Sequence, residues 1–162
     1  MPARRKSEVD EQRWLTGDEL ATWRGFMKLV QRLPAALESQ LQQDSNLSFV
    51  EYHVLAHLSE QPERRMRLSE LALLANTELS RLSHLVGRLE KRGFAYREPD
   101  PDNGRYTRAV LTAEGFAHLE SAAPAHVARV LGLFVDVLEP DDLRALRRIS
   151  AKVLARIDAE AG

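Results

Sequence analysis

Residues 68–112 read LSELALLANTELSRLSHLVGRLEKRGFAYREPDPDNGRYTRAVLT, and this stretch decides the fold. Two helical patterns joined by a short turn end at Gly93, a residue type common just after helices because it tolerates a positive φ. Two strand-like runs follow, residues 94–98 and 106–111, joined by a charged, proline-rich connection that contains Asn103 and Gly104. The Asn-Gly pair predicts a tight hairpin turn with positive φ values. The stretch therefore predicts a helix-turn-helix followed by a β-hairpin wing.

The second helix of this unit has two chemically different faces. Apolar residues recur on one face at intervals of three and four, which predicts a stripe packed on a core; they are Leu79, Leu82, Leu85, Val86 and Leu89. The opposite face carries hydroxyls, an imidazole and cations, which hydrogen-bond base edges and phosphates in a major groove; these are Thr77, Ser80, Arg81, His84, Arg88 and Lys91. Gly87 shares this face at a cost of about 1 kcal/mol relative to alanine, so we expect DNA to approach the backbone there.

Arg105 directly follows the expected hairpin turn. An arginine at the tip of a wing can enter an adjacent minor groove, where negative potential attracts it. The alternative is a solvated loop arginine paired with Asp100 or Asp102, and the neighbouring helix favours DNA over that alternative. A second basic group, Arg64, Arg65 and Arg67, precedes the unit. It is equally consistent with phosphate contacts and with plain surface charge.

The runs LSELA (68–72), SRLSHLVGRLEKRGF (80–94) and REPDPDNGRYTRAVLTAEG (97–115) resemble the winged helix-turn-helix of the MarR family of bacterial transcriptional regulators. The resemblance is specific over residues 66–115 and extends, as helix order and length, over nearly the whole chain. It implies a homodimer in which the second helix of each unit enters the major groove of double-stranded DNA and the wing enters the minor groove.

The same resemblance assigns particular side chains. It matches Ser80, Arg81, Ser83 and His84 to the groove-facing segment, and Arg105 to the wing arginine. One position departs from the family: Asn103 stands where an aspartate, two residues before the wing arginine, is usual. The charge pair that such an aspartate would form with Arg105 is then missing or shifted to Asp102.

The whole chain, residues 1–162, is predicted to be one mainly α domain with a small β-wing (α+β). It comprises a flexible tail at residues 1–13, dimerisation helices at 14–47 and 113–162, and the winged helix-turn-helix at 48–112. Capping boxes at Thr16 with Glu19 and at Ser48 with Glu51 mark two helix starts. Further helix signals are a kink at Pro34, a cap at Ser69, a cap at Thr112 for a helix running to about residue 138, and Pro140 opening the last helix.

The net charge of −1 hides a segregated distribution. Residues 64–108 hold ten Lys or Arg against six Asp or Glu, a net of +4, and the remainder has a net of −5. The basic part is therefore the expected DNA-binding part. The chain has no cysteine, which excludes disulfides and cysteine redox chemistry. Neither a membrane-spanning stretch nor the apolar core of a signal peptide is evident, so we expect a cytoplasmic protein without membrane contact.

His53 and His57 lie four residues apart, a spacing that places two imidazoles on one helix face. Two imidazoles make an incomplete metal site, and no HExxH or cysteine cluster completes it, so we predict neither a metal nor a cofactor. The resemblance implies instead that a small phenolic or aromatic acid binds between the dimerisation helices and the DNA-binding unit. Trp23, His53, His57 and His118 are the candidate effector-binding residues.

The predicted function is a sequence-specific, dimeric, DNA-binding transcriptional regulator, a repressor that a small-molecule effector releases from an inverted-repeat operator. An enzyme is not expected, because the chain has no GxSxG, GxGxxG or P-loop motif, no complete metal set and no cysteine nucleophile. The remaining alternative is a dimeric interaction module that uses the winged helix to dock a protein.

Overall fold

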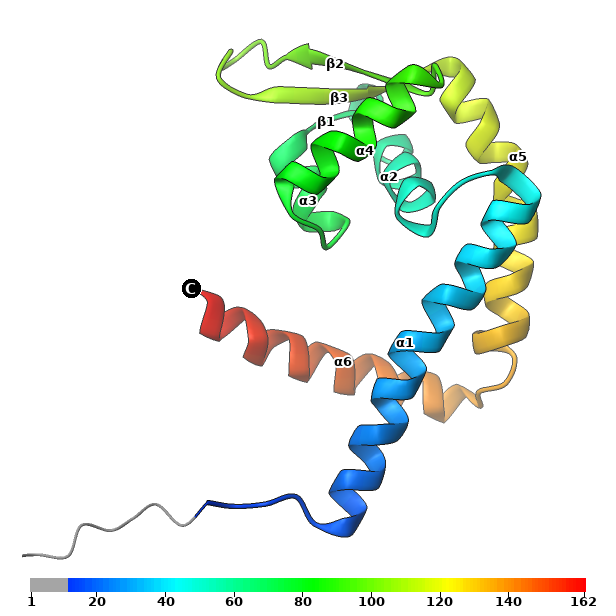
Figure 1. The fold of residues 1–162 in the computed structure, drawn as a ribbon, viewed down its shortest axis with the longest axis vertical. Coiled ribbons are helices and arrows are strands. Elements are labelled where there is room, and N and C mark those ends of the chain that lie inside the picture. The colour runs from blue at the N-terminus through cyan, green and yellow to red at the C-terminus, as the bar shows by residue number, and fades with distance from the viewer. Residues whose placement is uncertain (1–11) are drawn as a thin grey trace, which may run out of the picture. The chain divides into compact units, whose positions relative to one another are not determined.

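A computed structural model describes residues 12–162 of the chain, and most of the tail predicted for residues 1–13 lies outside this range. The described chain is mostly helical with one small antiparallel sheet (Figure 1), which confirms the expected fold class. It divides into two compact units, the first ending at Leu33 and the second running from Pro34 to Gly162.

Helix α1 (Gly17–Ser45) begins at the predicted capping box. The Thr16 hydroxyl accepts the Glu19 backbone N–H at 3.2 Å, and the Glu19 carboxylate accepts the Thr16 backbone N–H at 2.9 Å. The helix continues through Pro34, which cannot donate a helical backbone hydrogen bond. The boundary between the two compact units falls at this proline.

Three short helices form the helical part of the winged helix: α2 (Phe49–Ser59), α3 (Leu68–Leu74) and α4 (Leu79–Lys91). The Ser48–Glu51 capping box opens α2 as predicted. A brief 3₁₀ turn, η1 (Pro62–Arg64), follows α2. The helices share one apolar core, whose fully buried large side chains are Leu41, Leu47, Val54, Leu55, Leu58, Leu71, Leu82, Val86 and Leu89. Most of the predicted apolar stripe of α4 thus faces this core.

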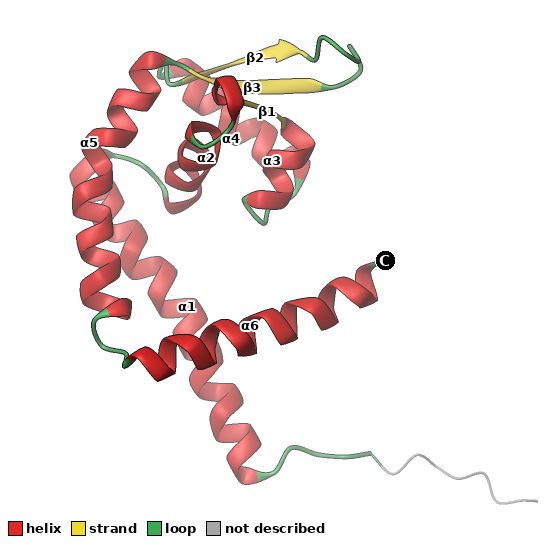
Figure 2. Ribbon diagram, turned by 180° about the vertical axis from the view of Figure 1, so that it is seen from behind, coloured by secondary structure: helices red, strands yellow, loops and turns green. Residues whose placement is uncertain are grey.

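The sheet has three antiparallel strands in the order β1-β3-β2: β1 (Arg65–Arg67), β2 (Ala95–Pro99) and β3 (Thr107–Leu111). Met66 and Arg97 are both paired with Ala109 of the central strand. Strand β1 leads directly into α3, and the β2–β3 hairpin extends beyond the helices as a wing (Figure 2). The wing is therefore joined through its central strand to the start of the helix-turn-helix.

The tight Asn-Gly turn predicted for the wing is wrong. Residues 100–106 form a wider connection, and neither Asn103 nor Gly104 has a positive φ. The Asp100 N–H donates to the Tyr106 carbonyl at 2.9 Å, and the Tyr106 N–H donates to the Asn103 carbonyl at 3.0 Å. A loop of this length turns the chain gradually, so it does not need the left-handed residues that a two-residue turn requires.

Two local predictions inside the helix-turn-helix are also wrong. Ser69 does not cap α3, because β1 runs straight into the helix and Arg67 occupies the N-cap position without a side-chain cap. Leu79 is not part of the buried stripe of α4: it is 51% exposed, whereas Leu82, one turn later, is 0% exposed. As the first residue of α4, Leu79 lies beyond the edge of the core.

Beyond the wing, the Thr112 hydroxyl accepts the Gly115 N–H at 3.0 Å and caps α5 (Ala113–Val130). A π-helical turn, η2 (Leu131–Val135), replaces the expected continuation to residue 138. Helix α6 (Pro140–Ala161) starts with Pro140 in its first turn, as predicted, and has no buried residue. Within residues 12–162, no helix taken alone is long and apolar enough to cross a membrane; α5 with η2 and α6 meet that test only together, as a pair bent by 95°.

Candidate nucleic-acid interface

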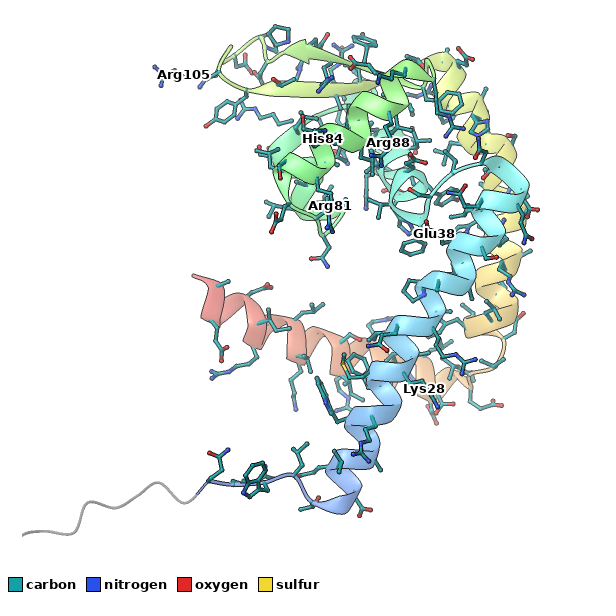
Figure 3. All side chains as sticks on the ribbon, in the orientation of Figure 1. Lys28, Glu38, Arg81, His84, Arg88 and Arg105 are labelled. Carbon is teal, nitrogen blue, oxygen red and sulfur yellow. The ribbon has the colours of Figure 1, made fainter. Side chains whose placement is uncertain are left out.

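The outward face of α4 carries most of the side chains that the sequence assigned to DNA. Ser80, Arg81, His84, Arg88 and Lys91 are exposed, and Ser83 is half-buried. The labelled side chains of Arg81, His84 and Arg88 lie along α4, and Arg105 lies at the far end of the wing (Figure 3). Because the apolar face of α4 is locked into the core, this polar face has a defined orientation.

Three cationic or imidazole groups on α4 make no internal ion pair within the described residues: Arg81, His84 and Lys91. Arg88 has a weak partner, since its Nε lies 3.6 Å from a Glu51 carboxylate oxygen while its side chain stays 60% exposed. Thr77 lies in the turn before α4 and is half-buried. The face thus presents charge that the chain itself does not neutralise, which is the form of a phosphate-binding surface.

Arg97 of β2 adds a cation that the sequence analysis missed. Glu90 of α4 accepts the Arg97 backbone N–H at 2.8 Å and the side-chain Nε–H at 3.0 Å. The Arg97 Nη1 also reaches the Ser83 hydroxyl at 3.4 Å. Burial tends to raise the pKa of Glu90, but the hydrogen bonds and charge of Arg97 outweigh it and hold that pKa below its usual value. The pair therefore joins the wing to α4 and keeps Arg97 on the outward face.

Strand alternation was the signal that could have identified Arg97. Successive side chains of a strand point to opposite faces, so Arg97 shares a face with Ala95, which is buried against the helices. An arginine two residues from a buried alanine is therefore directed toward α4. The sequence pattern contained this information, but the partner carboxylate on α4 was not evident from it.

An open hollow of about 670 Å³ lies between α4 and β2. Its lining residues are Ser83, His84, Gly87, Arg88, Glu90, Lys91 and Arg97. A Cβ atom at Gly87 would meet a single side-chain atom within 4 Å, the Arg97 Nη2 at 3.5 Å, which is an ordinary contact. Packing within the chain therefore does not require glycine at position 87, and close approach of an external partner stays the prediction for it.

Arg105 at the wing tip is exposed and forms no ion pair with Asp100 or Asp102, the partners proposed by the alternative interpretation. The Asn103 side-chain oxygen accepts the Arg105 backbone N–H at 3.1 Å. Asn103, the position that departs from the family, thus holds the backbone of the wing arginine and leaves its guanidinium uncommitted within residues 12–162.

The carboxylate at the base of the wing loop, Asp100, belongs to a different pair. Its Oδ2 accepts the Arg67 Nε–H at 2.6 Å, and its Oδ1 accepts the backbone N–H groups of Asp102 and Asn103 at 2.8 and 3.2 Å. The hydrogen bond from Arg67 lowers the pKa of Asp100 to about 2, and the two backbone N–H groups act in the same direction against the effect of burial. Asp100 is therefore ionised throughout the neutral range.

The basic group that precedes the helix-turn-helix also has internal partners. The Arg64 guanidinium lies over the Phe116 ring, 3.6 Å from its centroid. Arg65 pairs with Glu98 at 2.9 Å, and Arg67 pairs with Asp100. These contacts favour a structural role over phosphate binding for this group.

The candidate effector residues lie on three elements, Trp23 on α1, His53 and His57 on α2, and His118 on α5. The His118 Nε2–H donates a 2.8 Å hydrogen bond to the Ser45 carbonyl, and the ring stacks on Phe94 with 4.5 Å between ring centroids. His53 and His57 lie together on α2, with ring centroids 6.5 Å apart. Trp23 belongs to the first unit. No group of three or more metal-binding side chains occurs in the described part of the chain.

A histidine that the sequence analysis did not select, His126 of α5, extends the α2 pair. Its ring centroid lies 6.1 Å from that of His53 and 4.2 Å from that of Tyr52, and its Nδ1 is 3.1 Å from the Gln40 side-chain oxygen. Burial lowers the pKa of His126, and the nearby His53 lowers it further. This His–Tyr cluster, made of Tyr52, His53, His57 and His126, joins α2 to α5.

The chain is similar to known proteins in sequence and in structure. A family model described as the MarR family matches residues 47–107, which cover α2 through the first residue of β3. The HTH-type transcriptional regulator YkoM of Bacillus subtilis (strain 168) is 30% identical over 81 residues, 50% of this chain. The chain spans about half the length of YkoM, 50%.

Two solved structures from Streptomyces coelicolor are similar over nearly the whole chain. Sco3205, a MarR family transcriptional regulator solved in complex with DNA, is 41% identical with a TM-score of 0.86, over 90% of this chain and 91% of its own. AbsC, also a MarR family transcriptional regulator, is 35% identical with a TM-score of 0.87, over 91% of this chain and 99% of its own. The similarity thus reaches well beyond the winged helix.

Proposed function

Because the chain belongs to the MarR family of DNA-binding transcriptional regulators, we propose that it reads a specific operator as a homodimer through α4 and the wing. The family consists of transcriptional regulators, not enzymes. The observation that carries the proposal is the outward face of α4, where Arg81, His84 and Lys91 have no internal ion-pair partner among the described residues.

In this proposal α4 enters the major groove. The N-terminal residues of a recognition helix contact base edges, which gives Ser80, Arg81, Ser83 and His84 the base-reading positions. Arg88, Lys91 and Arg97 lie further along the interface, where cations that neutralise phosphates provide affinity without sequence information. Thr77 precedes the helix and is assigned to a backbone contact. Arg105 of the wing enters the neighbouring minor groove.

Apolar surface supports the homodimer. Helix α6 has no buried residue, yet it carries a row of half-exposed apolar side chains: Ile149, Val153, Leu154 and Ile157. The first unit has its own exposed apolar side chains: Trp14, Leu15, Trp23, Phe26, Leu29 and Val30. A contiguous exposed apolar surface usually marks an interface. A second copy of the chain would cover these residues, and the operator would then be an inverted repeat with half-sites about 34 to 36 Å apart.

The regulatory part of the proposal is repression relieved by a small aromatic or phenolic acid. The His–Tyr cluster supports it, because imidazole and phenol rings can stack on an aromatic ligand and a ring N–H of His53 or His57 can donate a hydrogen bond to its carboxylate. A ligand that binds one of two dimer geometries more tightly shifts the population toward that geometry. Salicylate serves as the probe: it should weaken operator binding by the wild type and have less effect on a His53→Ala variant. Equal operator affinity with and without salicylate would count against this class of effector.

The DNA-binding proposal is tested by selecting bound duplexes from a random pool and then measuring affinities for the enriched duplex. Arg81→Ala should weaken binding to that duplex by about 1 to 3 kcal/mol if Arg81 reads a base, and should relax the sequence preference at one position of each half-site. The matched control is Arg148→Ala on α6, which removes the same charge from an exposed site outside the proposed DNA interface. Equal losses for the two variants, or no enrichment of an inverted repeat, would contradict the assignment.

A further inference from the structure

Asp100 is a buried carboxylate at the base of an exposed loop. It is 5% exposed, while every residue from 101 to 107 is exposed. Burying a carboxylate is costly unless the charge is paired and its oxygens accept hydrogen bonds. Both conditions are met here: Oδ2 accepts from the Arg67 guanidinium, and Oδ1 accepts from two backbone N–H groups of the loop. Both carboxylate oxygens of Asp100 therefore accept hydrogen bonds, although the loop residues that follow it are exposed.

The partner of Asp100 is distant in the sequence and sits at a structural junction. Arg67 lies 33 positions earlier, where it is both the last residue of β1 and the N-cap of α3. Its guanidinium also lies over the Tyr106 ring, 4.6 Å from the centroid. Since Asp100 and Tyr106 are the two ends of the wing loop and are themselves hydrogen-bonded at 2.9 Å, Arg67 contacts both ends of the loop at once.

Within the loop, hydrogen bonds continue from Asp100 to the wing arginine. The Asp100 Oδ1 fixes the backbone of Asp102 and Asn103, and the Asn103 side chain then accepts the Arg105 N–H at 3.1 Å. The Arg105 side chain makes no ion pair within the described residues. Within the described residues, the backbone of the loop is therefore what positions Arg105 relative to α3 and α4.

We propose that Asp100 is the positioning residue of the wing: through Arg67 it anchors the loop to the start of α3 and so holds Arg105 where it meets DNA. The proposal rests on the DNA-binding role assigned to Arg105 above. It explains how the loop is held although Asn103 carries no charge to pair with Arg105.

The direction of the change in DNA affinity distinguishes this proposal from a simple effect of charge. Asp100→Asn removes a negative charge close to the DNA polyanion, and charge alone would then strengthen binding. Loss of the anchor instead weakens binding, because Arg105 must be ordered at the moment of association. The matched control is Asp102→Asn, two residues away in the same loop, which makes the same change at an exposed carboxylate that has no ion pair among the described residues.

The experiment measures dissociation constants for the enriched inverted-repeat duplex with the full chain and its variants. Asp100→Asn should bind roughly twofold to thirtyfold more weakly than the wild type, and Asp102→Asn should bind equally well or more tightly. In an Arg105→Ala background, Asp100→Asn should cause no further loss, because the anchor acts through Arg105. Binding by Asp100→Asn as tight as that of Asp102→Asn, or a full additional loss in the double variant, would overturn the proposal.

Amide hydrogen exchange shows whether the anchor acts locally. In Asp100→Asn the backbone amides of Asp102, Asn103 and Arg105 should exchange faster, while the amides of α4 keep their protection. Arg67→Gln should reproduce both the exchange and the affinity changes, and Arg67→Lys should restore part of the affinity because it keeps the charge. Loss of α4 protection in both Asp100→Asn and Arg67→Gln would assign the pair to general folding and overturn the positioning role.

The same set of variants distinguishes failure of the anchor from failure of the wing assignment. If Arg105→Ala weakens binding but Asp100→Asn does not, the anchor is refuted and the wing assignment stands. If Arg105→Ala binds as tightly as the wild type, the role of the wing arginine in the proposed function is refuted, and the anchor proposal fails with it.

Discussion

Helices α4 and α6 are both amphipathic, but only α4 has its apolar side inside the core of its own chain. Leu82, Val86 and Leu89 of α4 are 0% exposed, whereas Ile149, Val153 and Ile157 of α6 are 49%, 50% and 55% exposed. The two helices show a similar periodicity in the sequence. Periodicity therefore indicates that a helix has an apolar face, and leaves open which surface covers that face.

The difference follows from what surrounds each helix. The apolar face of α4 packs on a core that it shares with α2, α3 and the sheet, all within residues 49–111. None of the residues of α6 is buried by the described part of the chain. One face of α4 is thus free for DNA because the other is satisfied internally. The apolar face of α6 is consistent with burial by a second copy.

The largest effect is expected from a substitution in the exposed apolar face of α6. Leu154→Glu places a charge in the proposed dimer face and should separate the protomers, which lowers operator affinity by roughly 10²-fold to 10⁴-fold as bivalent binding is lost. The far-ultraviolet circular dichroism spectrum should remain that of a folded, mostly helical protein. Sedimentation velocity and DNA titration measure the two quantities together.

The control for this variant is its neighbour, Ala155→Glu. Ala155 is exposed on the other side of α6 and receives the same added charge. It should leave both the oligomeric state and the operator affinity unchanged. A dimeric Leu154→Glu protein with normal affinity would show that α6 does not form the interface.

A smaller effect is expected within α4, where a buried leucine is compared with an exposed one. Leu82→Ala should lower the free energy of unfolding by about 2 to 5 kcal/mol, because it leaves a cavity in the core. Leu79→Ala removes the same atoms from a residue that is 51% exposed and should cost less than half as much. Urea denaturation measures both values, and comparable losses would contradict the different burial of the two leucines.

The smallest effect concerns the outward face of α4. Gly87→Ala should raise the free energy of unfolding by up to about 1 kcal/mol, because alanine favours the helix and its Cβ would make an ordinary contact with Arg97. The same change should weaken operator binding if the DNA backbone approaches position 87. In that case thermal unfolding of this single variant shows higher stability, and DNA titration shows lower affinity. Tighter or unchanged DNA binding would show that the glycine is not needed at the interface.

The sequence predicted the order of the main helices and of the wing hairpin, the fold class and the helix starts at Thr16, Ser48 and Thr112. The helix starts depend on side chains and backbone groups three residues apart, so local chemistry is sufficient to predict them. It misplaced the wing turn and the cap at Ser69, where the outcome depended on the loop length and on β1 leading directly into α3. Leu79 was misjudged because helical period alone does not show where a core ends.

The chemical groups of the proposed interface were also legible in the sequence, since exposed polar residues on α4 follow from its period. The residues that hold the interface together were not. Arg97 is joined to Glu90 through the packing of β2 on α4, and Asp100 is joined to Arg67 across 33 positions of chain. Local hydrogen-bonding and periodicity thus determine which helices form and which face is polar. Strand register and helix packing decide which charges pair, because those charges meet only after the chain has folded.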